Sequence, residues 1–103
     1  MCGVVAVIGK HNASELVIEG LKKLEYRGYD SAGVATLFDG KINEVKSEGR
    51  VDNLEKNSLV QNMEGTIGIG HVRWATHGLP NSINAHPHSS QNVSVVHNGI
   101  IEN

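Results

Sequence analysis

The sequence has 103 residues, enough for one small domain with a modest core. Nine basic and eleven acidic residues are spread without runs and leave a net charge of −2, which argues against a nucleic-acid or acidic membrane partner. There is no basic-then-apolar leader and no apolar stretch of about 20 residues, and a single cysteine cannot form an internal disulfide, so we expect a cytoplasmic protein.

The first elements along the chain are a strand and a helix. The apolar run over residues 3–8 is typical of a strand that is buried on both faces. Asn12 and Glu15 form a capping pair at the start of a helix. Apolar residues at helical spacing continue this helix to about residues 27–28, where a glycine ends it.

A hairpin and a second helix are predicted next. Residues 31–38 and 41–47 read as two strands joined by Asp39-Gly40, a strong hairpin-turn sequence, with the second strand more polar and more exposed. A weaker helix is predicted over 51–63. Its inward-facing residues would be Val51, Leu54, Leu59 and Met63.

The last third of the chain alternates strands with one long loop. Residues 66–73 predict a strand whose two glycines suit close packing or a bulge. Residues 74–91 are polar and aperiodic, and a loop of that length in a small domain is usually functional. A strand over 92–97 leads to a second hairpin turn, Asn98-Gly99, and residues 100–101 begin a further strand. Because the sequence stops there, we expect a piece of a longer protein.

Cys2 directly follows the initiator methionine, which indicates an N-terminal nucleophile. Removal of Met1 would leave a cysteine with a thiol and a free α-amine on the same residue. An α-amine has a pKa of about 7.7–8.0, so part of it is unprotonated near neutral pH and can act as a base. The alternative is that Cys2 is a small buried hydrophobic residue.

Four further residues could complete a site for attack on an amide. Asn98 and the N–H of Gly99 could stabilise an oxyanion, although Asn-Gly also serves as a simple turn. Arg73, at the junction of a strand and the long loop, is a candidate clamp for a carboxylate, or else a solvated surface residue. Trp74 is either a lid over the site or part of the core.

The histidines of the second half could suggest zinc, because His86-Pro87-His88 brings two of them close together. Cysteine or carboxylate partners at recognisable spacing are lacking, however. We therefore predict no metal site and no cofactor. The histidines are interpreted as hydrogen-bonding groups at strand ends and in the loop.

Five runs of sequence together carry a specific family resemblance. Their order and spacing resemble the N-terminal glutaminase domain of the glutamine–fructose-6-phosphate aminotransferase family, a branch of the class II glutamine amidotransferases. The amidophosphoribosyltransferase branch usually has His-Arg-Gly-Gln where this chain has Tyr-Arg-Gly-Tyr, and asparagine synthetases have Arg-Gly-Pro-Asp. The five runs, which extend from the first residue to the last, are 1–5, 24–33, 70–78, 84–88 and 96–103.

The resemblance implies an α+β fold, the αββα sandwich of the N-terminal-nucleophile hydrolases. Residues 1–103 would be the N-terminal and incomplete part of the glutaminase domain. In the family, the position that matches Cys2 attacks the side-chain amide of glutamine, giving a γ-glutamyl thioester and ammonia. The positions that match Asn98 and Gly99 stabilise the oxyanion.

The resemblance also implies which residues bind the substrate. Positions that match Arg73, Thr76 and His77 hold the glutamine. Trp74 matches a residue of the mobile loop that closes over it. His86 matches a histidine of a site loop, without a specified role.

The whole family enzyme has partners beyond glutamine. Ammonia passes to C-terminal sugar-isomerase domains, where fructose 6-phosphate becomes glucosamine 6-phosphate, and we expect a homo-oligomer at full length. The family's glutaminase domain continues past Asn103 with an aspartate that binds the substrate's ammonium group. We therefore expect this stretch alone to be poorly folded or inactive. Two alternatives stay open: an amidophosphoribosyltransferase-like glutaminase domain and a non-catalytic glutamine-binding fragment.

Overall fold

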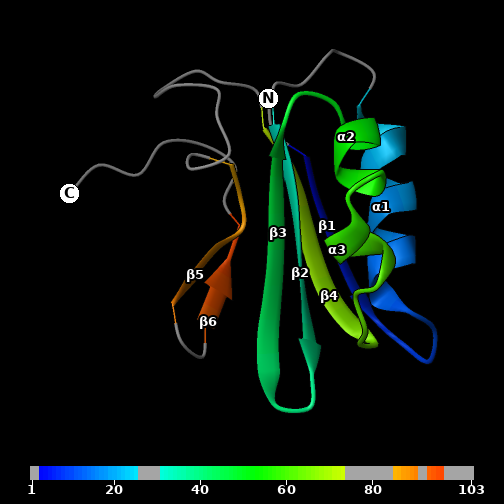
Figure 1. Ribbon diagram of the computed structural model, residues 1–103, viewed down its shortest axis with the longest axis vertical. Coiled ribbons are helices and arrows are strands. Elements are labelled where there is room, and N and C mark those ends of the chain that lie inside the picture. The colour runs from blue at the N-terminus through cyan, green and yellow to red at the C-terminus, as the bar shows by residue number, and fades with distance from the viewer. Residues whose placement is uncertain (1–2, 26–30, 74–84, 91–92, 97–103) are drawn as a thin grey trace.

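An antiparallel sheet with helices on one face forms the body of the molecule (Figure 1). The computed structural model describes residues 3–25, 31–73, 85–90 and 93–96. Four of the strands form one sheet in the order β1-β4-β2-β3, and two shorter strands pair in a second sheet. The elements, in chain order, are β1 (Gly3–Ile8), α1 (Ala13–Leu24), β2 (Ser31–Phe38), β3 (Lys41–Glu48), α2 (Val51–Glu55), α3 (Ser58–Gln61), β4 (Ile67–Arg73), β5 (His88–Ser90) and β6 (Val93–Val95).

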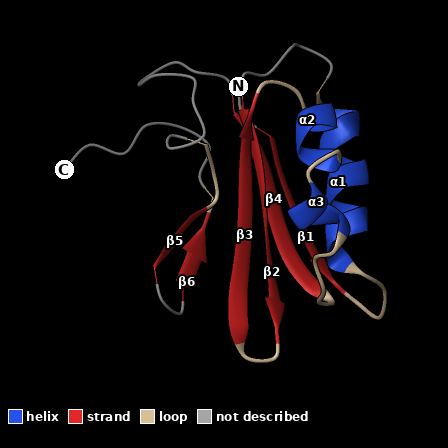
Figure 2. Ribbon diagram, viewed as in Figure 1, coloured by secondary structure: helices blue, strands red, loops and turns tan. Residues whose placement is uncertain are grey.

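The two faces of the four-stranded sheet meet different partners. The three helices lie on one face, and the β5–β6 hairpin lies on the other (Figure 2). Because side chains alternate along a strand, Val72 of β4 faces the helices while His71 and Arg73 face the hairpin side. One buried cluster joins the helices to their face of the sheet. Its members are Val17, Ile18, Leu21, Ala32, Val34, Val45, Val51, Leu54, Val60, Met63 and Val72.

Glycine in β4 lets α1 approach the sheet closely. A methyl group added at Gly70 would overlap Val17 Cγ1 and lie 3.1 Å from Leu21 Cδ1. The predicted close packing at the strand's glycines is therefore confirmed at this position. The helix sits in a groove that any side chain at residue 70 would fill.

The predicted hairpin is confirmed, and its turn has the expected geometry. Asp39 and Gly40 both have positive φ, 52° and 74°, as a type I′ turn requires. Ser31 pairs with Glu48 at the open end, and Phe38 pairs with Lys41 at the turn. The β3 strand alternates exposed and half-buried residues around Val45, as its polar sequence indicates.

The predicted helix over 51–63 is wrong in its continuity. It is two short helices, α2 and α3, and Asn57 begins the second by accepting a hydrogen bond from the Leu59 N–H at 2.9 Å. An asparagine side chain competes with helical backbone bonds and favours a cap. The break turns Leu59 outward, so that it is 67% exposed and not part of the core as predicted.

Three expectations for the first elements are also wrong. The Asn12 side chain makes no capping hydrogen bond, and the Ala13 N–H instead donates to the Gly65 carbonyl at 2.8 Å. The α1 helix ends at Leu24, earlier than residues 27–28. The β1 strand is covered on its helix-facing side only, and Ile8 on the other side is 85% exposed.

The long loop predicted over 74–91 contains a strand. Residues 88–90 form β5, which pairs with β6 so that His88 lies opposite Val95 and Ser89 opposite Ser94. The predicted strand over 92–97 corresponds to β6, whereas the turn and strand predicted over 98–101 lie outside the described residues. None of the helices within the described ranges is long and apolar enough to cross a membrane.

The hairpin is tied to the sheet by polar groups. The Ser89 hydroxyl donates a hydrogen bond to the Glu44 carboxylate of β3 and also contacts Ser94 Oγ at 2.9 Å. Glu44 in turn forms an ion pair with Lys46 at 3.7 Å. The Ser89–Glu44 hydrogen bond holds the hairpin over the sheet face that the helices leave open.

Candidate functional site

Arg73 is the last residue of β4. The predicted site residues Cys2 and Trp74 adjoin this end of the sheet in the sequence, because Cys2 precedes β1 and Trp74 follows Arg73. The Arg73 side chain is 7% exposed, so it is not the solvated surface arginine that the alternative interpretation required. Ser31, the first residue of β2, is its cross-strand partner and is fully buried. A buried guanidinium needs an anionic or hydrogen-bonding environment, which suits the predicted carboxylate clamp.

The start of β1 lies next to the Arg73 end of β4. Gly3 pairs with Val72, the residue before Arg73. Gly3 also directly follows Cys2 in the sequence. Adjacent strands lie about 4.8 Å apart, so the sheet register brings the first described residue of the chain close to the predicted clamp.

His86 is held against the open face of the same sheet. Its ring stacks on the ring of His71 with the centroids 4.2 Å apart and the planes 20° from parallel. Its backbone lies over Gly33, where an added methyl group would overlap the His86 carbonyl oxygen. Ala85 and Pro87 on either side are fully buried, whereas His86 keeps some exposure.

The other predicted site residues lie outside the described residues. The structure therefore neither supports nor contradicts their predicted positions. They are Cys2, Trp74, Thr76, His77, Asn98 and Gly99. Of the predicted site residues, the described ranges contain Arg73 and His86, and both belong to the face of the sheet opposite the helices.

Sequence reasoning missed three residues that surround this pair. Gly33 and His71 were not assigned a site role, although they are cross-strand partners next to Ser31 and Arg73. The Ser31 hydroxyl is buried without a hydrogen-bond partner. The usable signal was the alternation of the strand, since His71 lies two positions before Arg73 and therefore shares its face.

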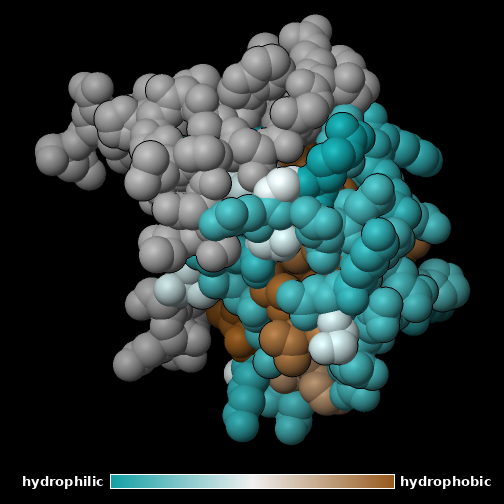
Figure 3. All heavy atoms as spheres, turned by 45° about the horizontal axis from the view of Figure 1, so that its top comes forward, coloured by the Kyte–Doolittle hydropathy of each residue, from teal (hydrophilic) through white to brown (hydrophobic). Residues whose placement is uncertain are grey.

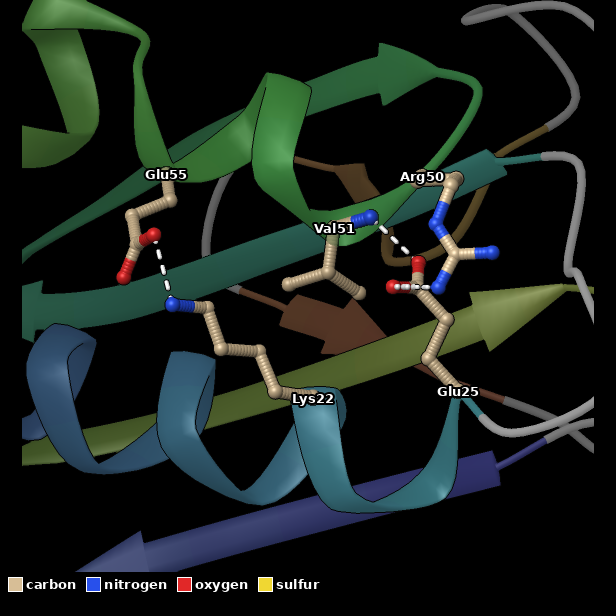
Figure 4. A network of polar contacts seen from close by, with 5 residues as sticks. All are labelled: Lys22, Glu25, Arg50, Val51 and Glu55. Carbon is tan, nitrogen blue, oxygen red and sulfur yellow. Dashed lines mark hydrogen bonds and ion pairs between the residues drawn. The ribbon is translucent and has the colours of Figure 1, made fainter.

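A polar network behind the site joins α1 to α2 (Figure 4). The Glu25 carboxylate is buried at 5% exposure, accepts a hydrogen bond from the Val51 N–H and forms an ion pair with Arg50 at 3.2 Å. Lys22 bonds Glu55 at 2.6 Å, and this hydrogen bond raises the pKa of Lys22 above its usual value. The Glu25 contacts connect the end of α1, just before residues 26–30, to the start of α2, and the Lys22–Glu55 pair connects α1 to the end of α2.

A cavity of about 400 Å³ lies on the same face of the sheet but at its other end. It is lined by apolar side chains that include Leu37, Ile42 and Ile67, with Ser94 of the hairpin. The space-filling view shows apolar surface gathered in the lower part of the molecule (Figure 3). Ile67 and Arg73 are six residue steps apart along β4, about 20 Å, so this cavity is not the predicted glutamine site.

Within the described ranges, no group of three or more histidine, cysteine or carboxylate side chains is arranged to hold a metal ion. The two described histidines nearest Arg73 are instead stacked on one another. The chemistry available at this edge of the sheet is therefore that of a buried cation, a hydroxyl and an imidazole.

Comparison with known sequences gives strong matches over the whole chain. Proteins named glutamine–fructose-6-phosphate aminotransferase (isomerizing) are 64% identical in Clostridium acetobutylicum, 55% in Mesorhizobium japonicum and 56% in Pyrococcus horikoshii. Each match covers 100% of this chain but only 17% or 18% of the relative. The chain thus spans under a fifth of the length of these proteins. No protein-family model matches it.

Solved structures give the fold. Glutamine phosphoribosylpyrophosphate amidotransferase from B. subtilis matches with a TM-score of 0.73 and 28% identity over 91% of this chain and 20% of that one. A structure described as the allosteric regulatory enzyme of purine biosynthesis matches with a TM-score of 0.74 and 28% identity, over 85% of this chain and 19% of that one.

Sequence and fold are therefore both similar to those of glutamine amidotransferases, and the fold is of the N-terminal-nucleophile hydrolase type. The predicted α+β fold is confirmed. Within this class, the sequence resemblance is to the N-terminal part of the isomerising glutamine–fructose-6-phosphate aminotransferases, as the five sequence runs indicated.

Proposed function

We propose that this chain is the glutamine-hydrolysing part of a glutamine–fructose-6-phosphate aminotransferase. Glutamine is split into glutamate and ammonia, and the ammonia converts fructose 6-phosphate to glucosamine 6-phosphate in the full-length enzyme. The observation that carries the proposal is the 53–64% identity to proteins of that name along the entire chain. The burial of Arg73 agrees with it, because Arg73 lies at the same end of the sheet as Gly3, the residue that follows Cys2.

The reaction begins with attack by the Cys2 sulfur on the amide carbon of the glutamine side chain. The α-amine of the processed Cys2 takes the thiol proton and delivers it to the leaving nitrogen, so that ammonia departs and a γ-glutamyl thioester remains. Asn98 and the Gly99 N–H stabilise the negative oxygen of each tetrahedral intermediate. Water then attacks the thioester, the same amine removes its proton, and glutamate and the thiol are released.

Substrate binding falls to the residues around the long loop. Arg73 provides a planar pair of donors for the α-carboxylate of glutamine. Thr76 and His77 hold the same substrate, Trp74 covers it, and His86 contributes from the returning end of the loop. Burial of Arg73 supports this role, because a desolvated guanidinium binds a carboxylate more strongly than an exposed one.

The proposal extends to the rest of the enzyme. Residues 1–103 form the N-terminal part of the glutaminase domain, sugar-isomerase domains follow, and fructose 6-phosphate binds there. We place the enzyme in the cytoplasm as a homo-oligomer. The exposed apolar side chains of the open sheet face, Val4, Ile8, Leu37 and Ile67, support a larger domain in which further strands cover them. By that reasoning these 103 residues alone do not hydrolyse glutamine.

A second candidate is the amidophosphoribosyltransferase reaction, favoured by the two structural matches. Both matches have 28% sequence identity, about half of what the sugar-phosphate relatives show. The glutaminase fold is common to the two branches, so the structural likeness does not separate them. The sequence does, and it favours fructose 6-phosphate as the acceptor.

The test is active-site labelling of the full-length enzyme. A diazoketone analogue of glutamine should alkylate Cys2 stoichiometrically, with protection by glutamine, and Cys2→Ala should abolish both labelling and glutamate formation. Mass spectrometry of the active enzyme should find Met1 removed. Product analysis with fructose 6-phosphate and with phosphoribosyl pyrophosphate then identifies the acceptor. Binding of glutamine without turnover would indicate the non-catalytic alternative instead.

A further inference from the structure

His71 is the most completely buried imidazole among the described residues. It is 0% exposed in the middle of the sheet, on the face away from the helices. Its ring lies parallel to that of His86, with centroids 4.2 Å apart. A ring stacked on a fixed neighbour loses most of its freedom to rotate, because turning it would break the contact.

The backbone of His86 is also held in place, by its close contact with Gly33. Gly33, the cross-strand partner of His71, leaves a space that the His86 carbonyl occupies. A methyl group at residue 33 would overlap that oxygen and come within 2.8 Å of the Pro87 Cδ atom. His71 of β4 thus fixes the ring of His86, and its cross-strand partner Gly33 of β2 fixes the His86 peptide. We call Gly33 and His71 together the His86 seat.

In this seat His86 stays partly exposed to solvent, whereas the residues on either side of it are buried. Ala85 and Pro87 are fully buried, whereas His86 is only partly so. Arg73 lies two residues beyond His71 on the same face of the same strand, about 7 Å along it. His86 therefore keeps some exposure, and its ring plane is fixed near the proposed carboxylate clamp.

We infer that His71 is a positioning residue for glutamine binding, which acts by holding the His86 imidazole in its bound orientation. This inference rests on the proposed function. A side chain that is already fixed loses little freedom when the substrate binds, so the seat lowers the KM for glutamine and leaves kcat nearly unchanged. His71 itself need not touch the substrate.

The experiment measures glutamate formation by the full-length enzyme as glutamine is varied. His71→Leu, which removes the flat ring, should raise KM about three- to tenfold with kcat changed less than about twofold. His71→Phe keeps a flat ring and should restore most of the loss. Gly33→Ala, which displaces the His86 peptide, should raise KM by a similar factor.

A double-mutant cycle separates positioning from a general structural effect. In a His86→Ala enzyme, His71→Leu should raise KM no further, because the group it holds has gone. Val60→Ala is the matched control: it removes buried packing in α3, away from the seat, and should leave KM unchanged.

Four outcomes would overturn the inference. Additive effects of His71→Leu and His86→Ala on KM would show that His71 does not act through His86. A fall in kcat at constant KM, an unaltered KM in folded Gly33→Ala, or failure of folded His71→Phe to restore KM would each do the same. Absence of glutamine hydrolysis by the unaltered enzyme refutes the proposed function, and this result is distinct from all four.

Discussion

Replacing Glu25 by alanine should open the junction between α1 and α2. Its carboxylate accepts a hydrogen bond from the Val51 N–H in a buried position. A hydrogen bond to a charged group contributes about 1.5–3 kcal/mol. The ion pair with Arg50 adds less than about 1 kcal/mol, because the arginine side chain is 58% exposed and screened by water. We expect a net loss of about 2–3 kcal/mol of local stability.

Two milder variants separate the components. Glu25→Gln keeps an oxygen acceptor for the Val51 N–H but removes the charge, and should cost about 1 kcal/mol. Arg50→Ala keeps the charged acceptor and removes only the exposed ion pair, and should cost less than about 1 kcal/mol. The predicted order of destabilisation is therefore Glu25→Ala first, with the other two well below it.

Hydrogen exchange measured by mass spectrometry on the full-length enzyme is the appropriate assay, because it reports local opening without requiring two-state unfolding. The peptide spanning residues 48–56 should exchange about 30- to 150-fold faster in Glu25→Ala, and about fivefold faster in Glu25→Gln. A peptide from the start of α1 is the internal control and should change little. The reasoning is refuted if Glu25→Ala accelerates exchange less than twofold, or if the glutamine variant is as fast as the alanine variant.

Three further predictions concern packing, exposure and pH. Gly70→Ala places a methyl group against Val17 and should cost about 1–3 kcal/mol, seen as a lower midpoint of thermal unfolding; an unchanged midpoint would mean that α1 is not seated against β4 as described. Leu59→Ser should change stability by less than about 0.5 kcal/mol, because the leucine is exposed, and a larger loss in urea unfolding would contradict that exposure. The raised pKa of Lys22 means that its pairing with Glu55 stabilises the fold below pH 10.5 and is lost as the pH rises through the folded pKa. In Lys22→Met that alkaline loss of stability should be smaller, as measured by denaturation at pH 7 and across pH 10–11.5.

Elements with local causes followed from the sequence closely. The hairpin of β2 and β3 was predictable because Asp39-Gly40 can adopt two consecutive positive φ angles, and this geometry also sets the register of the strands. The β1 strand was predictable because a continuous apolar run of this length suits a strand. The buried state of Arg73 also agrees with the site role assigned from its place in the chain.

Features that depend on distant residues did not follow. The Ala13 N–H takes its partner from Gly65, so no local pattern could show that Asn12 would not cap α1. The β5 strand lies within a run that has no periodicity, because its partner strand and the Glu44 side chain hold it in place. Tertiary context overrode local propensity in both cases.

The sequence by itself determined strands β1 to β4 and β6, the turn between β2 and β3 and, through its motif spacing, the family resemblance. These depend on side-chain periodicity and on backbone angles that single residues prefer. Only the tertiary structure decided the sheet order β1-β4-β2-β3, and with it the meeting of Gly33, His71 and His86. Contacts between residues so far apart in the chain depend on how the whole core packs, and no local preference encodes them.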